Sequence, residues 1–432
     1  MTTSHAIRHV RVTPIAFRDP PLLNAAGIHE PWALRSIIEI ETDSGLVGIN
    51  ESYGDQPMLE ALAKAAPALQ GLSPWSLNEM ETRVSALVKP PAKASEFLGV
   101  GAQISLAPGT HVSKNVAKVV SAFEVAMMDL QGQLANAPVV DLLGGAARDR
   151  VPFSAYLFYK YAEHIEKPYA PDPWGEALTP EQLVAQARRM IDGYGFQSIK
   201  LKAGALPPAQ EAAGILALAK AFPGKPLRID PNANWSVATS LKIVEQLRGV
   251  LEYYEDPAPG LDGMAAVARE CEVPLATNMV VTDFDEFRRN AERGCPVKIV
   301  LSDHHYWGGL RATQRLSTLC STFGLGLSMH SNSHLGISLV AMTHLCASVP
   351  LLNYACDTHY PWQDEEIVEG GRLRFEQGSL RVPPGPGLGA TLDRTALARL
   401  HDNYLHCGIR NRDDLAQMKK YDPSFTGIQP RF

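Results

Sequence analysis

The sequence predicts an α/β protein: a closed barrel of alternating strands and helices, joined to a smaller α+β domain made from the head of the chain. Three observations indicate this fold. The middle of the chain repeats a unit in which a short apolar strand ends on a polar residue and a Gly-, Pro- or Asn-rich loop leads into an amphipathic helix. The head instead alternates apolar and polar residues. At 432 residues, 45% hydrophobic and 20% charged, the chain is too long for one small core and is not collagen-like or disordered.

The head predicts an antiparallel meander followed by helices. Apolar and polar residues alternate in three runs, and Asp43-Ser44-Gly45 forms a turn between the second and the third. The runs lie at 6–17, 37–41 and 46–50. Apolar residues then recur at spacings of three and four, which predicts helices at 58–69, 76–88 and 116–134.

The middle of the chain predicts a barrel. Its first helix begins at Thr179-Pro180-Glu181-Gln182, a capping signature with Pro at the first position, and stops at 193–195 before the next strand. The expected strands end at Phe158, Lys202, Asp230, Glu255, Asn278, Asp303, His330 and His359. From the second strand onward these ends lie roughly 23 to 29 residues apart, close to the roughly 250 residues over eight units of a (β/α)₈ barrel. Eight strands that alternate with helices favour parallel pairing and closure.

The tail of the chain, after about Gly370, returns to short strands at 373–375 and 379–382, a turn-rich stretch at 383–389 and a helix at 393–407. About 60 residues are few for an independent domain. We therefore expect the tail to pack back on the head.

The charge balance argues against nucleic acid and membranes as partners. The chain has 40 Lys and Arg against 46 Asp and Glu, a net charge of −6, and no basic run that would follow a phosphate backbone. It has no signal-peptide pattern and no window of roughly 18 apolar residues. Six cysteines without a Cys-x-x-Cys pair indicate reduced thiols. We expect a cytoplasmic protein.

Three of the strand ends carry oxygen ligands for a metal. Asp230, Glu255 and Asn278 end consecutive strands, and neighbouring strands lie about 4.8 Å apart, so side chains at one height can share an ion. Each residue alone would be ordinary loop chemistry. Two carboxylates and an amide oxygen together predict Mg²⁺, a hard cation that keeps positions open for water or substrate.

Two further strand ends suggest proton transfer. Lys200 and Lys202 are one residue apart, so both point to the same side of their strand, where two ammonium groups are expected to lower each other's proton affinity. His330 follows the strand after Asp303, and a carboxylate bonded to one imidazole nitrogen fixes the tautomer and frees the other nitrogen. His330 and His334 are four residues apart, but no Glu accompanies them as in the zinc-binding helix of metalloproteases, so the sequence does not indicate a zinc site there.

Taken together, these motifs resemble the enolase superfamily, and the glucarate dehydratase group within it, over essentially the whole chain. The pieces that carry the resemblance are 24–29, 122–133, 142–145, 156–158, Lys200-Leu-Lys202, Asp230-Pro-Asn232, Glu255-Asp-Pro257, 276–279, Asp303, His330-Ser-Asn332, Asp357-Thr-His359 and Arg412-Asp-Asp414. The resemblance implies a modified TIM barrel of the (β/α)₇β type with an α+β capping domain. The expected division is a cap at 1–125, a barrel at 126–369 and a C-terminal segment at 370–432 that completes the cap.

The resemblance also implies the chemistry. Mg²⁺ would be held by Asp230, Glu255 and Asn278, and a proton α to a carboxylate would be removed before the β-hydroxyl leaves, as a 2-keto-3-deoxy sugar acid forms. The implied catalytic residues are Lys202 and His330 as bases on opposite faces of the substrate, Lys200 against the enediolate charge, Asp303 orienting His330, and Asn232 near the reacting centre. The implied substrate-binding residues are Asn24, His29, Tyr156, Ser331, Asn332, His359 and Arg412.

Two positions depart from the family pattern. Ala26 and Ile104 stand where hydroxyl residues are expected, which removes hydrogen-bond donors from the distal pocket. The diacid D-glucarate is the leading substrate, and a monoacid aldonate is the alternative. A racemase or epimerase, a non-catalytic relative and a Schiff-base aldolase are the other hypotheses. A homo-oligomer acting on a small sugar acid is expected.

Overall fold

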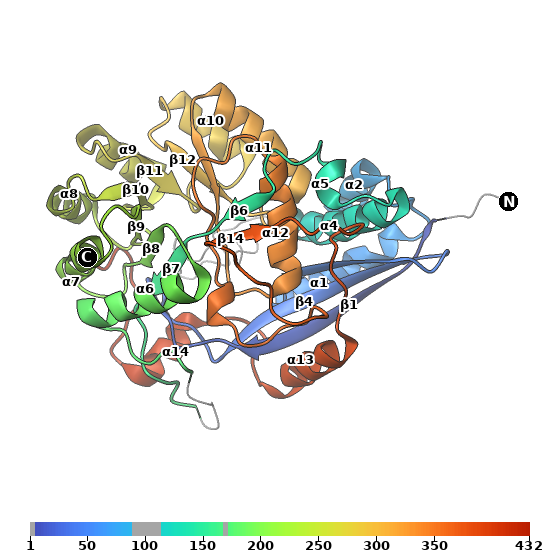
Figure 1. Ribbon diagram of the computed structural model, residues 1–432, viewed down its shortest axis with the longest axis horizontal. Coiled ribbons are helices and arrows are strands. Elements are labelled where there is room, and N and C mark those ends of the chain that lie inside the picture. Colours follow the sequence, from blue (N-terminus) through green and yellow to red (C-terminus); the bar gives the residue numbers. More distant parts are fainter. Residues whose placement is uncertain (1–4, 89–113, 167–171) are drawn as a thin grey trace.

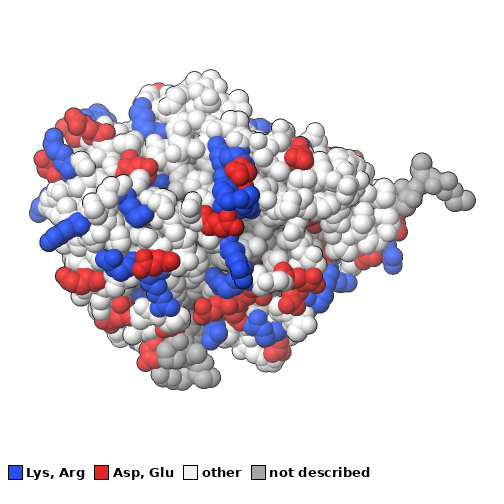
Figure 2. Space-filling model, in the orientation of Figure 1, with Lys and Arg blue, Asp and Glu red and all other residues white. Residues whose placement is uncertain are grey.

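A computed structural model describes residues 5–88, 114–166 and 172–432 of the chain. Figure 1 shows two neighbouring bodies: a curled parallel sheet surrounded by helices, and an antiparallel sheet built from the head, with the red helices of the tail along its lower side. Within these residues, no helix combines the length and the apolar character that crossing a bilayer requires. Figure 2 shows acidic and basic side chains mixed over the visible face.

The head forms the predicted antiparallel sheet. Its strands β1 (Ile7–Arg18), β4 (Trp32–Thr42) and β5 (Val47–Tyr53) pair in that order. A short hairpin, β2 (Leu23–Asn24) and β3 (Gly27–Ile28), interrupts the chain between the first two. In the β4–β5 register Arg35 lies opposite Tyr53, and Ile37 lies opposite Glu51. Because side chains alternate along a strand, Arg35, Glu51 and Tyr53 share one face of the sheet.

The predicted helices of the head are confirmed. They are α1 (Gln56–Ala65) with the 3₁₀ turn η1 (Ala66–Leu69), α2 (Leu77–Leu87) and α4 (Asn115–Ala135), followed by the short α5 (Val139–Leu142). Helix α4 is buried along most of its length and packs on β5. The contact is so close that a Cβ on Gly48 would lie 2.1 Å from the carbonyl oxygen of Ala126. Only glycine allows this approach.

Seven parallel strands form the barrel wall, in chain order around the sheet. They are β7 (Ala155–Phe158), β8 (Ile199–Lys202), β9 (Leu227–Asp230), β10 (Leu251–Glu255), β11 (Leu275–Thr277), β12 (Ile299–Ser302) and β13 (Gly326–Met329). The helices that follow them are α6 (Pro180–Tyr194), α7 (Pro208–Ala221), α8 (Val237–Gln246), α9 (Gly260–Glu270), α10 (Phe284–Glu292), α11 (Leu310–Thr322) and α12 (Gly336–Ser348). The predicted capping box of α6 is present, with Thr179 and Gln182 bonding reciprocally, and the helix ends at Gly195 in the left-handed conformation (φ 76°).

The expected eighth strand, ending at His359, is wrong. Residues 353–357 lie between β13 and β7 but form a single bridge, Phe153 to Cys356, rather than a strand. The backbone N–H of Asp357 donates to Met329 of β13 (2.9 Å), and that of Ser154 donates to Cys356 (2.9 Å). The segment therefore takes the place of the eighth strand, between β13 and β7, with few hydrogen bonds.

The tail contacts both bodies. Strand β14 (Ser379–Arg381) pairs with β6 (Arg150–Pro152), α13 (Arg394–His406) packs on β1, and α14 (Asp414–Tyr421) packs on β3. The tail therefore lies against the head, and the division into cap, barrel and C-terminal segment stays a prediction. The strand expected at 373–375 is wrong, since the N–H of Leu373 donates to the Tyr360 hydroxyl (2.8 Å) instead of to a neighbouring strand. The domain boundaries at 125 and 369 stay predictions.

Candidate active site

The polar residues expected at strand ends gather at one end of the barrel. Lys202, Asp230 and Glu255 are the last residues of β8, β9 and β10. Asn278, Asp303 and His330 follow β11, β12 and β13 directly. All six side chains are buried. Because parallel strands carry their carboxyl ends to one rim, six separate segments contribute to one site.

The acidic strand ends offer a group of metal ligands. Oxygen atoms of Asp230, Glu255 and Asp256 lie within 4.8 Å of one another, in full burial. Neither polar atom of the Asn278 side chain has a hydrogen-bond partner among the described residues, although the residue is 0% exposed. A buried amide without partners is costly unless something else satisfies it. An oxygen-preferring cation fits this set.

Asp256 differs from its neighbours in this group. Its carboxylate accepts from the Thr277 hydroxyl and from the backbone N–H of Asn278 (3.0 Å). Burial, with the charge of Asp230, raises the pKa of Asp256 to about 7. These bonds tie the β10 loop to β11, so Asp256 supports the site by holding the segment that carries Asn278.

The two lysines have different surroundings. Lys200 is fully buried, and its Nζ lies 2.6 Å from Asp357 Oδ2 and 2.6 Å from Glu255 Oε2. Burial alone would lower the pKa of Lys200, but the carboxylates of Asp357 and Glu255 raise it well above its usual value. The expectation that the lysines weaken each other's hold on protons is therefore wrong for Lys200, which is a fixed positive charge.

Lys202 reaches a different group of atoms. Its Nζ lies 2.7 Å from Asp230 Oδ2 and also donates to the Asn232 side-chain oxygen. Asn232 is in the left-handed conformation (φ 53°), and its backbone N–H donates to Asp230 Oδ1 (2.9 Å). The turn after β9 thus presents Asn232 beside Lys202, and both side chains line the cavity described below.

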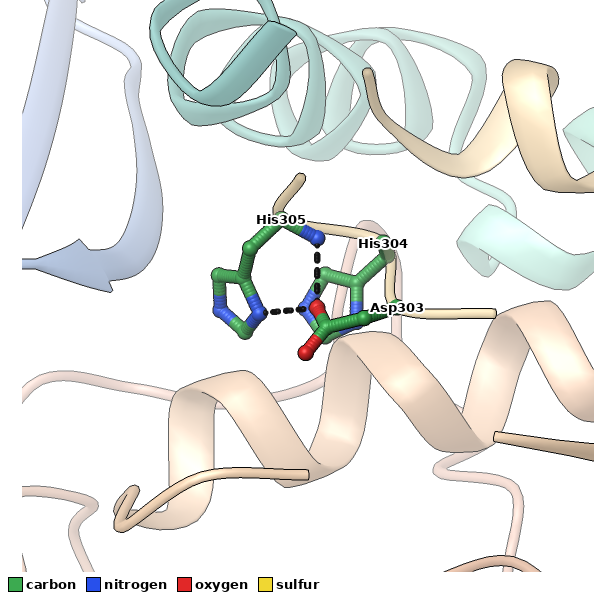
Figure 3. A group of neighbouring side chains, drawn as sticks. All are labelled: Asp303, His304 and His305. Carbon is green, nitrogen blue, oxygen red and sulfur yellow. Dashed lines mark hydrogen bonds and ion pairs between the residues drawn. The ribbon is translucent and has the colours of Figure 1, made fainter. Parts of the chain in front are cut away.

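His330 and Asp303 are bonded as expected. His330 Nδ1 lies 3.0 Å from Asp303 Oδ2. The other oxygen of Asp303 is held by His305, through its backbone N–H (2.8 Å) and its Nδ1 (2.7 Å), as Figure 3 shows. Burial alone would raise the pKa of Asp303, but the imidazoles of His305 and His330 lower it well below its usual value. Asp303 is therefore an anion between two histidines.

A second group of side chains lies close enough together to hold a metal ion. It consists of Asp303, His304 and His305, whose ligand atoms lie within 4.8 Å of one another. Both oxygens of Asp303 already accept hydrogen bonds, and His305 Nε2 lies 2.8 Å from an Arg35 nitrogen. Burial, with His305 nearby, lowers the pKa of His304 well below its usual value. Because both Asp303 oxygens and His305 Nε2 are already bonded and Arg35 adds a positive charge, the group does not favour a metal ion.

One cavity of about 50 Å³, partly open to solvent, joins the residues that sequence reasoning grouped as substrate-binding. All seven of those residues line it: Asn24, His29, Tyr156, Ser331, Asn332, His359 and Arg412. Lys202, Asn232 and His330 line it as well, with Ala26, Phe158 and Asp414. Ile104 lies outside the described residues.

The cavity has a polar end built by the head and the tail. Arg412 binds Asp414 through two parallel contacts, Nε to Oδ1 (2.7 Å) and Nη2 to Oδ2 (2.6 Å). Asn24 Nδ2 also donates to Asp414 Oδ2 (2.7 Å). Burial alone would raise the pKa of Asp414, but Arg412 lowers it below its usual value. Asp414 therefore orients both Arg412 and Asn24.

Aromatic rings cover the other side of the cavity. The His359 ring lies 4.9 Å from that of Tyr156 and 5.2 Å from that of Phe158. His359 Nδ1 lies 2.9 Å from the Ser331 hydroxyl. Burial, with the nearby His29, lowers the pKa of His359 well below its usual value. His359 is therefore a neutral hydrogen-bonding group.

Two family models match the chain. Residues 9–144 match the family model described as the mandelate racemase and muconate lactonizing enzyme N-terminal domain, and residues 182–396 match the enolase C-terminal domain-like model. A protein of Streptomyces coelicolor named probable glucarate dehydratase is 49% identical, with 100% of both chains covered. The chain belongs to the enolase superfamily.

Solved structures of enolase superfamily members have the same fold as this chain. An enolase from Pseudomonas fluorescens with bound magnesium, potassium and tartrate has a TM-score of 0.94 and 59% identity, with 100% of both chains covered. One from Thermobispora bispora, complexed with magnesium and formate, has a TM-score of 0.92 and 53% identity, covering 99% of this chain and 100% of the other. Among more distant relatives, a D-xylonate dehydratase from Haloferax volcanii is 24% identical, covering 85% of this chain and 84% of its own.

Magnesium is thus the metal of these superfamily neighbours, and the acidic group at the strand ends is able to hold one. Sequence reasoning gave no role to Asp357, Asp414 and His305. Asp357 and Asp414 lie inside the motifs that carry the family resemblance. The sequence therefore marked their positions but did not indicate which side chains they bind. For His305 the signal was the Asp303-His304-His305 run itself.

Proposed function

We propose that this chain is a Mg²⁺-dependent acid-sugar dehydratase that converts its substrate to a 2-keto-3-deoxy sugar acid, with D-glucarate as the leading substrate. The observation that carries the proposal is the single cavity in which Lys202, Asn232 and His330 lie together with all seven expected substrate-binding residues. Hydro-lyase chemistry on a sugar acid is also what the names of the relatives describe.

The proposed reaction begins with a weakly acidic C–H bond. A proton α to a carboxylate is hard to remove because an enediolate dianion forms, and groups fixed where that charge develops lower the barrier. Lys202 would take the proton, and Lys200, held as a cation by Asp357 and Glu255, would balance the new charge. When bound at Asp230, Glu255 and Asn278, Mg²⁺ would supply further positive charge beside the substrate carboxylate.

The second half of the reaction needs an acid. His330, with Asp303 on its Nδ1, would first take up a proton on Nε2, and the resulting imidazolium would donate that proton to the β-hydroxyl, which leaves as water. The carbon–carbon double bond that forms carries the α-hydroxyl, so the product is an enol, and it tautomerises to the 2-keto-3-deoxy acid. Asn232, bonded to Lys202, would orient the reacting end of the substrate.

The proposed diacid rests on the polar end of the cavity. Asn24, His29 and Arg412, which come from the head and the tail, offer hydrogen-bond donors to a second carboxylate. The probable glucarate dehydratase at 49% identity supports the same substrate.

A monoacid aldonate is the second candidate, and a specific contact favours it. Two nitrogens of Arg412 already bind Asp414, so its charge is balanced within the protein. Ala26 lines the cavity without offering a side-chain donor. A distal hydroxyl would suit such a neutral surface better than a second carboxylate would.

A substrate screen tests the proposal. Hexarates and aldonates are incubated with the protein and Mg²⁺, and the 2-keto acid product is detected with semicarbazide. We expect turnover of at least one hexarate. Turnover of aldonates alone would replace the diacid by the monoacid candidate. Deuterium incorporation into recovered substrate without keto acid would indicate a racemase or epimerase, and no reaction with any of these acids would contradict the proposal.

A further inference from the structure

A row of buried polar side chains runs from the head sheet to His330. Arg35 Nε donates to Glu51 Oε1 (3.1 Å), and an Arg35 Nη lies 2.8 Å from His305 Nε2. His305 Nδ1 then lies 2.7 Å from Asp303 Oδ1, and Asp303 Oδ2 lies 3.0 Å from His330 Nδ1. Arg35, Glu51, His305 and Asp303 are at most 4% exposed. The row lies behind the cavity, since of its members His330 alone is part of the cavity lining.

The partners of His305 assign its tautomer. An arginine side chain only donates hydrogen bonds, so His305 Nε2 is the acceptor in its contact with Arg35. The backbone oxygen of Glu51 also lies near Nε2, but at 3.3 Å it is the longer contact. The ring proton of neutral His305 is then on Nδ1, where it is donated to Asp303 Oδ1. The hydroxyl of Ser338, 3.2 Å from Nε2, can also donate to it.

Asp303 is fixed in turn. Its Oδ1 accepts from the Nδ1 and the backbone N–H of His305, which leaves Oδ2 for His330. The Tyr53 hydroxyl, 3.4 Å from Oδ2, comes from the same face of the head sheet as Arg35. An anion in this position selects the His330 form with a proton on Nδ1. The Nε2 atom is then the one available for proton transfer.

The same part of the head sheet holds the loop after His330. Glu51 Oε1 accepts from the backbone N–H of Leu335 (2.8 Å), and Oε2 accepts from that of Ser338 (3.0 Å). These groups lie at the start of α12, where unsatisfied N–H groups favour a carboxylate. Arg35 and Glu51 therefore support both members of the His330–Asp303 pair.

We propose that His305, held by Arg35, is a positioning residue for His330: it fixes the Asp303 carboxylate and thereby the tautomer and orientation of the His330 imidazole. The head sheet would then take part in acid–base chemistry, although the head residues that line the cavity, Asn24, Ala26 and His29, lie outside its three strands. This inference rests on the proposed role of His330 as the acid. The tautomer of His330 is nevertheless a property of the protein without substrate, so it can be measured independently of turnover.

Variants of His305 separate positioning from packing. His305→Leu removes the side-chain donor to Asp303 and leaves the backbone N–H in place, and we expect kcat to fall by about 100-fold with KM changed less than about twofold. In His305→Asn the amide nitrogen can take the place of Nδ1, so we expect at least a tenth of the original kcat to return. His344→Leu is the matched control, because His344 is an equally buried histidine that bonds to the backbone of Val140 and Leu388 outside the cavity. We expect it to keep kcat within about threefold.

A spectroscopic measurement tests the inference without turnover. Imidazole ¹⁵N spectra of the whole protein without substrate report which ring nitrogen carries a proton, and the His330→Asn variant identifies the His330 signals. We expect the Nδ1–H form in the original protein and in His305→Asn, and a mixture of both tautomers in His305→Leu. If His305→Leu fails to fold, Arg35→Lys, which loses the planar pair of donors, is expected to give the same mixture.

Two outcomes overturn the inference: an unchanged His330 tautomer in both His305→Leu and Arg35→Lys, or a loss of kcat in His344→Leu as large as that in His305→Leu. Failure of the substrate screen leaves the tautomer measurement intact, so an error in the proposed reaction is distinguishable from an error in the positioning role.

Discussion

At the scale of single residues, two lysines on one strand have acquired different properties. Lys200 is enclosed, with carboxylates of Asp357 and Glu255 at 2.6 Å and the Tyr156 ring at 4.7 Å. Lys202 has Asp230 at 2.7 Å and borders the cavity. The first is suited to balancing charge, and the second is able to reach a substrate proton. Because the two lysines are one residue apart on a strand, their side chains point in the same direction. Their different neighbours across the barrel give them different surroundings.

The two proposed acid–base groups give the first prediction. We expect Lys202→Ala and His330→Asn each to lower kcat by at least about 100-fold, because each removes a group that moves a proton in the transition state. Steady-state kinetics with the best substrate of the screen measures the loss. Circular dichroism and thermal unfolding should show an intact fold in both variants. Full activity in both would mean that the acid–base assignment is wrong.

A candidate site residue could be predicted from the sequence where a local pattern marks it, and not where it is defined by a contact with a distant segment. Asp230, Glu255, Asn278, Asp303 and His330 were found because a strand pattern precedes each one and parallel strands share a rim. Other partnerships join distant segments. Arg35 meets His305 from 270 residues away, and Lys200 meets Asp357 from 157 residues away. No local pattern signals such pairs, and residues 353–357 lack even the strand that would have aligned Asp357 with its neighbours.

At the scale of elements, the contact between β5 and α4 depends on one missing side chain. We expect Gly48→Ala to destabilise the protein by about 1 to 3 kcal/mol, because its Cβ would lie 2.1 Å from the Ala126 carbonyl oxygen and 2.6 Å from Leu130. The shift in the midpoint of thermal unfolding measures the effect. Gly193→Ala is the control, since a Cβ on that glycine of α6 has nothing within 4 Å. The control should be neutral or slightly stabilising, and equal losses in both would contradict the prediction.

Helix α7 supports the loop that follows Lys202. The Glu211 carboxylate accepts from the backbone N–H groups of Gly204 (2.8 Å), Ala205 (2.9 Å) and Leu206 (2.8 Å). Burial raises the pKa of Glu211 from 4.5 to about 8. The folded protein thus holds this proton more tightly than the unfolded chain does. The stability that it contributes is complete below about pH 4.5 and is lost as the pH rises through about 8.

Replacement of Glu211 by a neutral residue tests this dependence. Between about pH 6 and about pH 9 we expect the thermal midpoint of the original protein to fall more steeply than that of Glu211→Gln, which has no proton to lose there. The difference between the two slopes isolates Glu211 from the other titrating groups. Parallel slopes would show that Glu211 is already ionised in the folded protein at pH 6.

Elements were predicted well where their pattern was long. Helix α4 and the three head strands appear as expected, whereas the two errors, the strand at 373–375 and the eighth barrel strand, concern short apolar runs. A short run cannot be told from a loop by periodicity alone. At neither place does the backbone form a regular ladder of hydrogen bonds. At 373–375 the N–H of Leu373 donates to the Tyr360 hydroxyl, and at 353–357 backbone N–H groups donate to the carbonyl oxygens of Met329 and Pro152.

At the scale of the whole molecule, the cavity is assembled from three distant parts of the chain. Asn24, Ala26 and His29 come from the head, Arg412 and Asp414 from the tail, and the remaining lining from the barrel. Contacts of α13 with β1 and of α14 with β3 join the two ends of the chain. The proposed acid–base groups Lys202 and His330 stand at the ends of barrel strands, while the proposed substrate-binding residues of the head and the tail stand on these joined segments. We therefore expect the substrate contacts to vary without a change in the acid–base groups.

The metal site offers a whole-molecule measurement, because an ion that binds only the folded state stabilises all of it. At a free concentration about 100 times Kd the gain is about 2.7 kcal/mol. We expect Mg²⁺ to raise the thermal midpoint of the protein after treatment with a chelator. We expect a smaller rise in Asn278→Ala, which removes the buried amide that has no partner among the described residues. Asn403→Ala is the control: that side chain bonds the Ala16 carbonyl far from the strand ends, so the variant should keep the full rise whatever its starting stability. An equal rise in Asn278→Ala would remove Asn278 from the metal site, and no rise in the original protein would contradict the site itself.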